Sequence, residues 1–446
     1  MDSVWSKTVH LPQFEALQES KKTDVLIIGG GMAGILCAYF LQEIGVDYML
    51  VEGRRICSGV TKNTTAKITA QHGLIYGKLL KHEGAEKAGM YLAANQRAVE
   101  KYGQLCRDID CDFEEKTSYI YSKDAPEKLE EEAWALHQIG YEAKIVEVPE
   151  LPFRTAGAVA FAHQAQFHPL KFAAEIAKGL TIYENTFVTA VKDHTAFTEK
   201  GDITFEKVIF ATHFPIDNKH GMYFMKMYQE RSYVLALAGA AQIHGMYLDE
   251  AKGGYSFRNY QDLLLFGGGS HRTGKDGGKW QELRNFAKEH YPDSVEKYAW
   301  AAQDCMTLDQ IPYIGVYSKG MPDYLVATGF CKWGMTTSMT AAMMLSELVT
   351  GKVPSCQEVF KPSRNMLKPQ LAVNACEYLA NLIHFSKKRC PHLGCALKWN
   401  PEEHTWDCSC HGSRFQEDGT LLDNPATKDL RDGIQRLSES SGMIRR

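Results

Sequence analysis

The side chains best suited to metal chemistry gather near the C-terminal end of this sequence. Residues 390–413 read CPHLGCALKWNPEEHTWDCSCHGS, two short loops on either side of a polar turn. Thiolates and imidazoles are the ligands that zinc and iron–sulfur centres use. This stretch therefore predicts a metal centre, and its candidate ligands are Cys390, His392, Cys395, Cys408, Cys410 and His411.

Two kinds of metal centre fit the spacing. The loops read Cys390-x-His392, then fifteen residues, then Cys408-x-x-His411. Two thiolates and two imidazoles can hold one zinc ion in tetrahedral geometry, but zinc knuckles usually separate each pair by two or more residues. Zinc also leaves the other two cysteines without a role. A cluster in which one iron takes two thiolates and the other two imidazoles is therefore favoured.

The two loops closely resemble those that bind the cluster in Rieske [2Fe-2S] domains. The motifs that match are CPHLGC and CSCHGS, and NPATKDL (residues 424–430) resembles the proline loop that covers the cluster. Roughly 60 residues remain for this domain, so we expect a truncated all-β fold. The resemblance implies the ligands Cys390, His392, Cys408 and His411, and a disulfide between Cys395 and Cys410.

Two positions, one at the end of the second loop and one just after it, bear on the reduction potential. The resemblance places Ser413 to hydrogen-bond a cluster sulfur, but Phe415 stands where the family has a tyrosine. Fewer hydrogen bonds to the sulfurs stabilise the reduced state less. We therefore expect a potential below that of respiratory Rieske proteins.

The front of the chain predicts a dinucleotide site. An apolar run at residues 25–28 fits a buried parallel strand, residues 35–45 have helical periodicity, and residues 48–52 return as a second strand. Between the first strand and the helix, Gly29, Gly31 and Gly34 match GxGxxG, which lets the backbone approach a pyrophosphate. Glu52 ends the second strand, where a carboxylate can accept hydrogen bonds from an adenosine ribose.

Four further segments resemble FAD-dependent amine and amino-acid oxidases of the D-amino-acid-oxidase-like class. Residues 54–73 are similar to the loop that runs under the flavin, residues 167–191 to the helix and strand that hold the adenine, and residues 208–215 to the turn over the pyrophosphate. Residues 323–351 resemble a strand, a turn and a helix whose start favours negative charge on the reduced flavin. The contacts that this implies are Thr61, Thr65, Val188, Ala211, Gly329, Lys332, Trp333, Gly334, Met335 and Thr336.

A predicted hairpin in residues 255–274 offers a candidate substrate residue. It is similar to the paired strands that carry an arginine to the substrate carboxylate in glycine and sarcosine oxidases, and Arg258 falls at that position. A guanidinium can pair bidentately with a carboxylate. No catalytic general base is assigned, because the flavin carries the chemistry if hydride passes to it.

The chain is long enough for several domains of mixed α/β character. We expect a Rossmann-like FAD-binding domain in three pieces, an inserted antiparallel-sheet substrate domain in two, and the small all-β Rieske domain. The expected ranges are 1–21 for an N-terminal extension, 22–105, 151–219 and 305–350 for the FAD-binding domain, 106–150 and 220–304 for the substrate domain, 351–384 for a linker and helix, and 385–446 for the Rieske domain.

Composition excludes some functions. A net charge of -4, from 50 basic and 54 acidic residues without long runs of one sign, gives no footprint for nucleic acid or an anionic membrane. The sequence has no secretory signal and no apolar run long enough for a transmembrane helix, so we expect a cytoplasmic protein. The eight cysteines outside the loops are scattered singly, and we expect them to be reduced and buried.

Together these features predict a flavin dehydrogenase. An amine or amino acid would reduce FAD, and the [2Fe-2S] cluster would remove the electrons one at a time for a protein or quinone acceptor. Two alternatives stay open. One is an oxidase that makes peroxide and keeps the Rieske remnant only as a structural cap, and the other is a non-enzymatic redox sensor.

Overall fold

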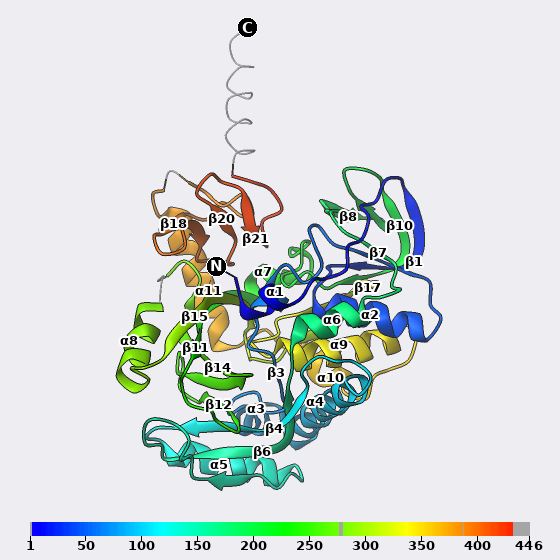
Figure 1. Cartoon of the computed structure of the whole chain (residues 1–446). Coiled ribbons are helices and arrows are strands. Elements are labelled where there is room, and N and C mark those ends of the chain that lie inside the picture. Colours follow the sequence, from blue (N-terminus) through cyan, green and yellow to red (C-terminus); the bar gives the residue numbers. More distant parts are fainter. Residues whose placement is uncertain (1, 276–279, 387, 431–446) are drawn as a thin grey trace.

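The computed structural model describes residues 2–275, 280–386 and 388–430, and the strands in these ranges form three sheets (Figure 1). Two large sheets build the body of the molecule. A small sheet near the C-terminal end of the chain, orange and red in Figure 1, lies against this body. The mixed α/β architecture confirms the predicted fold class, including the all-β C-terminal part.

The first sheet is the predicted dinucleotide-binding sheet. Its strands follow the order β16, β17, β10, β1, β2, β7, and β1 pairs in parallel with β2 and β10. The apolar end of β1, residues 25–28, is buried, as a central parallel strand requires. The bounds are β1 (Lys21–Ile28), β2 (Tyr48–Val51), β7 (Ile182–Tyr183), β10 (Ile203–Phe210), β16 (Tyr313–Ser318) and β17 (Met321–Thr328), with a side hairpin of β8 (Ala190–Lys192) and β9 (Thr195–Phe197).

Helices cover this sheet and its neighbour. α2 (Met32–Glu43) follows β1 directly, as the glycine motif predicts, and packs against α9 (Gly334–Val349), which follows β17. The methionines of α9 are largely core residues, for Met339 and Met344 are buried. The other helices of this layer are η1 (Val60–Asn63), α3 (Tyr76–Glu83), α4 (Ala85–Leu105), α6 (Pro169–Ile176) and α10 (Gln357–Phe360).

The second sheet is mainly antiparallel and follows the order β15, β11, β14, β13, β12, β4, β6, β3, with β5 on β6. Only the β12–β4 pair within it is parallel among the described strands. Its strands are β3 (Lys67–Ile68), β4 (Glu114–Ser122), β5 (Lys144–Val146), β6 (Gly157–Gln166), β11 (Met227–Ala238), β12 (Met246–Asp249), β13 (Ser256–Tyr260), β14 (Leu263–Arg272) and β15 (Val295–Thr307). Its flanking helices are α5 (Pro126–Gln138), α7 (Tyr223–Lys226) and α8 (Trp280–His290), while η2 (His220–Met222) lies beside α7 and β16.

The second sheet contains strands from ranges that were expected to belong to two different domains. β3 and β6 fall in ranges expected for the FAD-binding domain, yet they extend this sheet because β6 pairs with both β3 and β4. β15 likewise continues past residue 304 to Thr307. The connections between the sheets therefore do not coincide with the predicted boundaries.

The C-terminal module, defined here as residues 385–430, is a four-stranded meander. Its strands are β18 (Leu397–Asn400), β19 (Thr405–Cys408), β20 (Arg414–Gln416) and β21 (Leu421–Asp423), and α11 (Pro369–Ile383) precedes it as predicted. Its small core contains the four clustered cysteines together with Leu397, Phe415 and Ala426. Residues 431–446 of the predicted Rieske range lie outside the described residues.

The N-terminal extension is part of the body of the molecule. It contains α1 (Val4–Thr8), and Trp5 is fully buried. The indole of Trp5 donates to the carbonyl of Thr64 at 2.7 Å, and its ring packs edge-on against Tyr260. The extension thus supports the loop expected to run under the flavin.

The single cysteines mostly follow expectation. Cys376 is exposed, which corrects the prediction that all eight are buried, because its side chain lies on the solvent face of α11. The buried ones are Cys37, Cys57, Cys106, Cys111, Cys305, Cys331 and Cys356.

None of the described helices has the length and apolar character needed to cross a membrane.

Two glycine substitutions test the packing of α2 on β1. A Cβ at Gly34 would lie 1.8 Å from the carbonyl oxygen of Gly29, whereas a Cβ at Gly89 in α4 would meet open space. Gly34→Ala should therefore lower the free energy of unfolding by about 1–3 kcal/mol and weaken FAD binding. Gly89→Ala, the matched control, should raise it by about 0.5–1 kcal/mol. Denaturant melts check both, and equal effects would contradict the close packing.

Candidate functional site

A large cavity of about 730 Å³ runs between the two large sheets and reaches the C-terminal module. Of the predicted cofactor contacts, those that line it are Gly29, Gly31, Glu52, Thr61, Thr65, Val188, Ala211, Gly329, Lys332, Trp333, Gly334 and Met335. Gly34 and Thr336 do not line it but shape its wall. Thr336 exchanges hydrogen bonds of 2.9 Å with the backbone of Thr69 and so fixes the start of α9 against the loop under the flavin.

The nucleotide end of the cavity is built by backbone proximity. Gly29 has φ +113°, and a Cβ there would lie 2.5 Å from the carbonyl oxygen of Ala211, so only glycine fits this turn. Glu52 accepts hydrogen bonds from the backbone N–H groups of Gly30 at 2.7 Å and Arg54 at 2.9 Å. Burial raises the pKa of the Glu52 carboxyl above its usual range. The open glycine backbone and the acid form the cradle that an adenosine diphosphate moiety needs.

At the other end, the turn before α9 carries a charged pair. The Nζ of Lys332 lies 2.9 Å from Glu230 Oε2 on β11. Burial opposes ionisation of Glu230, but Lys332 outweighs it and lowers the pKa of this carboxyl to about 2. Beside the pair, the ring of Trp333 stacks on His72 at 4.8 Å. Lys332 and Trp333 thus border the cavity where the resemblance places the flavin.

Arg258 does not reach the cavity. Its side chain is buried, and NH1 donates to the carbonyls of Thr65 at 2.9 Å and Ala66 at 2.8 Å. Its Nε donates to the carbonyl of Asn259 at 3.2 Å. The guanidinium is thus directed into the loop under the flavin and lies outside the cavity lining.

Lys67, which the sequence reading did not single out, does line the cavity. Its Nζ donates to the carbonyl of Tyr247 at 2.9 Å and to the hydroxyl of Ser256. Burial, and then the charge of Arg258, lower the pKa of Lys67 to about 7. A half-buried lysine that hydrogen-bonds only neutral groups among the described residues can pair with an anionic ligand. In the sequence, the one feature that could have pointed to Lys67 is its position two residues after Thr65, a predicted cofactor contact.

The predicted iron ligands converge at one end of the C-terminal module. The thiol of Cys390 is within hydrogen-bonding reach of Cys408, and the rings of His392 and His411 lie 4.9 Å apart. Hydrogen bonds from neighbouring thiols, foremost Cys390, lower the pKa of Cys408 well below its usual range. Burial lowers the pKa of His392 to about 3 and that of His411 to about 4, so both imidazoles are neutral at neutral pH.

The imidazoles satisfy a test of fit to the cluster. The Nδ1 atoms of His392 and His411 are buried and have no hydrogen-bond partner in the described part of the chain. An unpaired buried acceptor is costly unless a ligand uses it. The Nε2 of His392 is engaged instead, with Asn218 Oδ1 at 2.8 Å. Two thiols and two free Nδ1 atoms are the donor set of a Rieske cluster.

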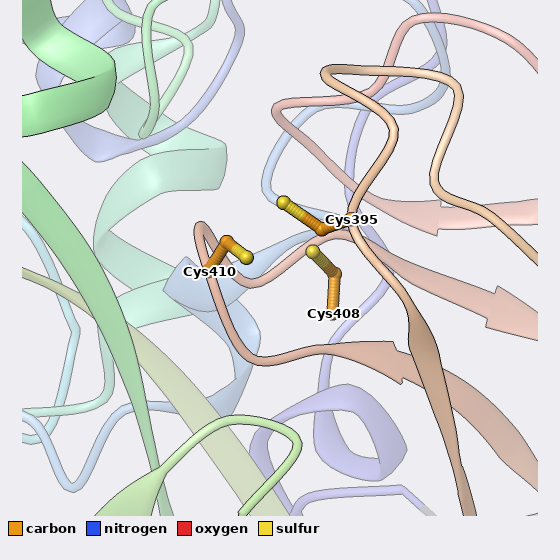
Figure 2. Close-up of side chains that lie close together, drawn as sticks. All are labelled: Cys395, Cys408 and Cys410. Carbon is orange, nitrogen blue, oxygen red and sulfur yellow. The ribbon is translucent and has the colours of Figure 1, made fainter. Parts of the chain in front are cut away.

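A different grouping is visible among the sulfur atoms. Those of Cys395, Cys408 and Cys410 lie within 4.8 Å of one another (Figure 2). A metal ion held by these three thiols would leave Cys390 and both free imidazole nitrogens unused. The same three sulfur atoms would also lie close together if Cys408 binds the cluster while Cys395 and Cys410, beside it, are not ligands. All four are free thiols in the structure, and it contains no disulfide between described residues.

Neutral and charged side chains of the second sheet hold the cluster loops. Gln229 donates to the carbonyl of His411 at 2.8 Å, and Gln303 donates to that of Gly412 at 2.8 Å. Arg272, at the end of β14, donates to the carbonyls of Ser409 at 2.7 Å and Cys410 at 2.9 Å. These three side chains bind the backbone of the second loop and fix its position.

One turn borders both the cavity and the cluster ligands. We call residues 211–218, which follow β10, the bridging turn. His213 lines the cavity, while the ring of Phe214 lies 6.5 Å from that of His392 and 6.4 Å from that of His411. Asn218 at the end of the same turn holds His392. Sequence reasoning could not find this role, because only the fold brings the turn to the loops.

Known proteins share both parts of this arrangement. Residues 24–348 match the family described as FAD dependent oxidoreductase (DAO), and residues 360–434 match the Rieske [2Fe-2S] domain. The fold and the two sites thus define a flavoenzyme joined to an iron–sulfur domain. The chain belongs to the DAO family of FAD-dependent oxidoreductases and carries a Rieske domain. Its cofactors are FAD and a Rieske-type [2Fe-2S] cluster.

Relatives repeat the whole arrangement or its first part. The Bacillus subtilis protein YhfW, described as a Rieske 2Fe-2S iron-sulfur protein, is 34% identical, with 96% of this chain and 97% of that protein covered. The gamma-glutamylputrescine oxidoreductase of Escherichia coli is 26% identical over 44% of this chain and 50% of its own length. Glycine oxidase from Geobacillus kaustophilus shares the fold, with a TM-score of 0.64, 19% identity, and coverage of 77% of this chain and 99% of that one.

Alanine substitutions separate the two groupings of sulfur ligands. Cys390→Ala should abolish the Rieske EPR signal and most bound iron, because a thiolate ligand is lost. Cys395→Ala should retain iron at reduced occupancy, and Cys376→Ala, at an exposed cysteine, should match the wild type. Iron analysis and EPR of the purified variants check this. Iron retained in Cys390→Ala but lost in Cys395→Ala would support the three-thiol site.

Proposed function

We propose that this protein oxidises an amine or amino acid at the FAD site and passes the electrons to its Rieske cluster. The observation that carries the proposal is the bridging turn. Its first residues line the cofactor cavity, and its later ones contact the two histidines expected to bind the cluster. The bridging turn thus joins the cluster ligands to the pyrophosphate part of the FAD site, and on this proposal the electrons pass from FAD to the cluster within the chain.

The substrate class is supported by the relatives and by the site. The names of two relatives state an amine and an amino acid, gamma-glutamylputrescine and glycine. Oxidation of such a compound to an imine removes a hydride from carbon and a proton from nitrogen. FAD, when bound, accepts the hydride, so the residues of this chain need only orient the substrate and exclude water.

The cluster defines how the electrons leave. A hydride carries two electrons, and a [2Fe-2S] cluster accepts one at a time, so two transfers follow each turnover. This one-electron outlet favours a protein or quinone acceptor over oxygen.

We also propose that Cys395 and Cys410, whose sulfurs lie close together, form the disulfide that joins the loops. A cytoplasmic location stays a prediction.

Anaerobic titration with a panel of amines and amino acids tests the proposed function. A true substrate should bleach the flavin absorbance and then produce the EPR signal of the reduced cluster. Bleaching without that signal would remove the cluster from the path. Stoichiometric peroxide in air would then favour the oxidase alternative, and redox-responsive cofactors without turnover of any compound would favour the sensor.

Asn218 provides a direct test of the bridging turn. Its side chain accepts the Nε2–H of His392, and such a hydrogen bond raises the basicity of a metal-bound imidazole. A more basic ligand stabilises the oxidised cluster, so Asn218→Leu should raise the cluster potential and leave the flavin potential unchanged. EPR-monitored redox titration measures both. Asn285→Leu, at an exposed asparagine of α8, serves as control, and an unchanged cluster potential in Asn218→Leu would contradict the contact.

We further propose that Lys67, rather than Arg258, meets a carboxylate of the substrate. Lys67 lines the cavity from β3 and reaches across to β12 and β13, whereas the guanidinium of Arg258 is taken up by backbone carbonyls. The ammonium of Lys67 lies on the cavity wall and makes only neutral contacts among the described residues. An incoming carboxylate would offset its desolvation.

Kinetics of Lys67→Met test this assignment. For an amino acid, kcat/KM should fall at least tenfold, mainly through KM, while an amine without a carboxylate should be affected less than twofold. Since burial lowers the pKa of Lys67 to about 7, wild-type kcat/KM for the amino acid should fall as the pH rises above that value, where the charge is lost. The Lys67→Met variant should not show this fall of kcat/KM with rising pH. Equal loss with both substrates would indicate a structural role.

A further inference from the structure

We propose that the C-terminal module completes the FAD site, through a segment that walls the adenosine diphosphate half of the cavity. This segment, residues 421–427, consists of β21 and the start of the predicted proline loop and is called the lid segment here. It borders the same cavity as the glycine turn after β1 and the predicted adenine contact Val188. Its lining residues are Leu421, Leu422, Asp423, Asn424, Ala426 and Thr427.

The first residue of the lid segment is bound at the adenosine end. The guanidinium of Arg54 donates from NH2 to the carbonyl of Leu421 at 2.6 Å. The backbone N–H of Arg54 donates to Glu52 Oε1 at 2.9 Å, and Glu52 is the acid at the ribose position. The lid segment therefore begins beside the residues that would hold the ribose.

Its middle is bound at the pyrophosphate end. The side-chain amide of Asn424 donates to the carbonyls of Thr212 at 2.5 Å and Phe214 at 2.9 Å. These carbonyls belong to the bridging turn, whose first residue, Ala211, touches the glycine turn after β1. From Leu421 to Asn424 the lid segment thus spans the length over which the adenosine diphosphate moiety would lie.

The other side of the lid segment is fixed by the cluster module. The backbone N–H of Ala426 donates to Ser413 Oγ at 3.0 Å, next to the second cluster loop. Arg414 donates from Nη1 to the carboxylate of Asp423 at 3.3 Å, and this contact ties the lid segment to the ion pairs that Arg414 makes within the module. One segment therefore covers the cluster loops on one side and the dinucleotide cavity on the other.

Leu422 is the side chain through which the wall can be altered without touching the cluster core. It lines the cavity but is not part of the apolar cluster that contains the four cysteines. A carboxylate at this position would line the cavity that the adenosine diphosphate moiety would occupy, and it would repel the phosphates. Thr420 is two residues away and outside the cavity lining, so the same charge there should not be felt by the cofactor.

The test compares Leu422→Asp with Thr420→Asp in the full chain. Apoprotein is titrated with FAD, followed by flavin fluorescence, and with ADP, followed by calorimetry. We expect Leu422→Asp to weaken both ligands at least tenfold, or about 1.4 kcal/mol, and Thr420→Asp to change neither more than twofold. A wild-type Rieske EPR spectrum, recorded on a separate, chemically reduced sample of each variant, shows that the module is folded. Wild-type affinities in Leu422→Asp would overturn the proposal.

A second measurement needs no variant. Because coupling is reciprocal, a cofactor that binds the lid segment must also stabilise it. Hydrogen exchange of the wild-type amides in residues 421–427 should slow at least tenfold when FAD is added to the apoprotein, with β18 as the internal reference. Unchanged exchange would overturn the proposal. Both measurements use oxidised protein without substrate, so their outcome is independent of the proposed electron transfer.

Discussion

The docking of the second cluster loop onto strands β11 and β15 is the contact on which both cofactor sites depend. A Cβ at Gly412 would lie 2.5 Å from Gln229 Cβ, so the loop can approach this closely only with glycine, whose φ is +91°. Gln229 and Gln303 then satisfy the carbonyls of the loop. A buried carbonyl left without a partner costs about 1–3 kcal/mol. These contacts place His411 beside the bridging turn and Asn424 over it.

This docking explains how so short a Rieske domain can be ordered. A sheet of four short strands has a small core, and such domains are marginal alone. Here the second sheet supplies one partner of a buried ionic network. Arg231 on β11 pairs with Glu403, and Arg414 joins Glu403 to Asp407 within the module. Removing one member would leave a buried charge unpaired, which costs more than the pair contributes.

The sequence alone was sufficient to predict the two cofactors, because the motifs that indicate them are local. The glycine motif, Glu52 and the two cluster loops each lie within one short stretch, and their spacing reflects the ligand directly. Arg258 shows the limit of this reasoning. Its residue type and hairpin position were predicted, but its direction depends on the carbonyls of Thr65 and Ala66, nearly two hundred residues earlier in the chain. Side-chain direction on a strand follows the packing of its neighbours, which no local pattern encodes.

The residues that connect the two sites were missed for the same physical reason. Asn218, Gln229 and Gln303 are ordinary polar side chains in their own segments, and each gains its role only when the C-terminal module is in place. In the C-terminal module, the Nε2 edge of the His392 ring points toward Asn218 and the body of the molecule, and not toward solvent. On the proposed function, electrons therefore enter the cluster through its histidine edge from within the chain. An external acceptor would then approach from another side of the module, so electrons would enter and leave the cluster through different surfaces.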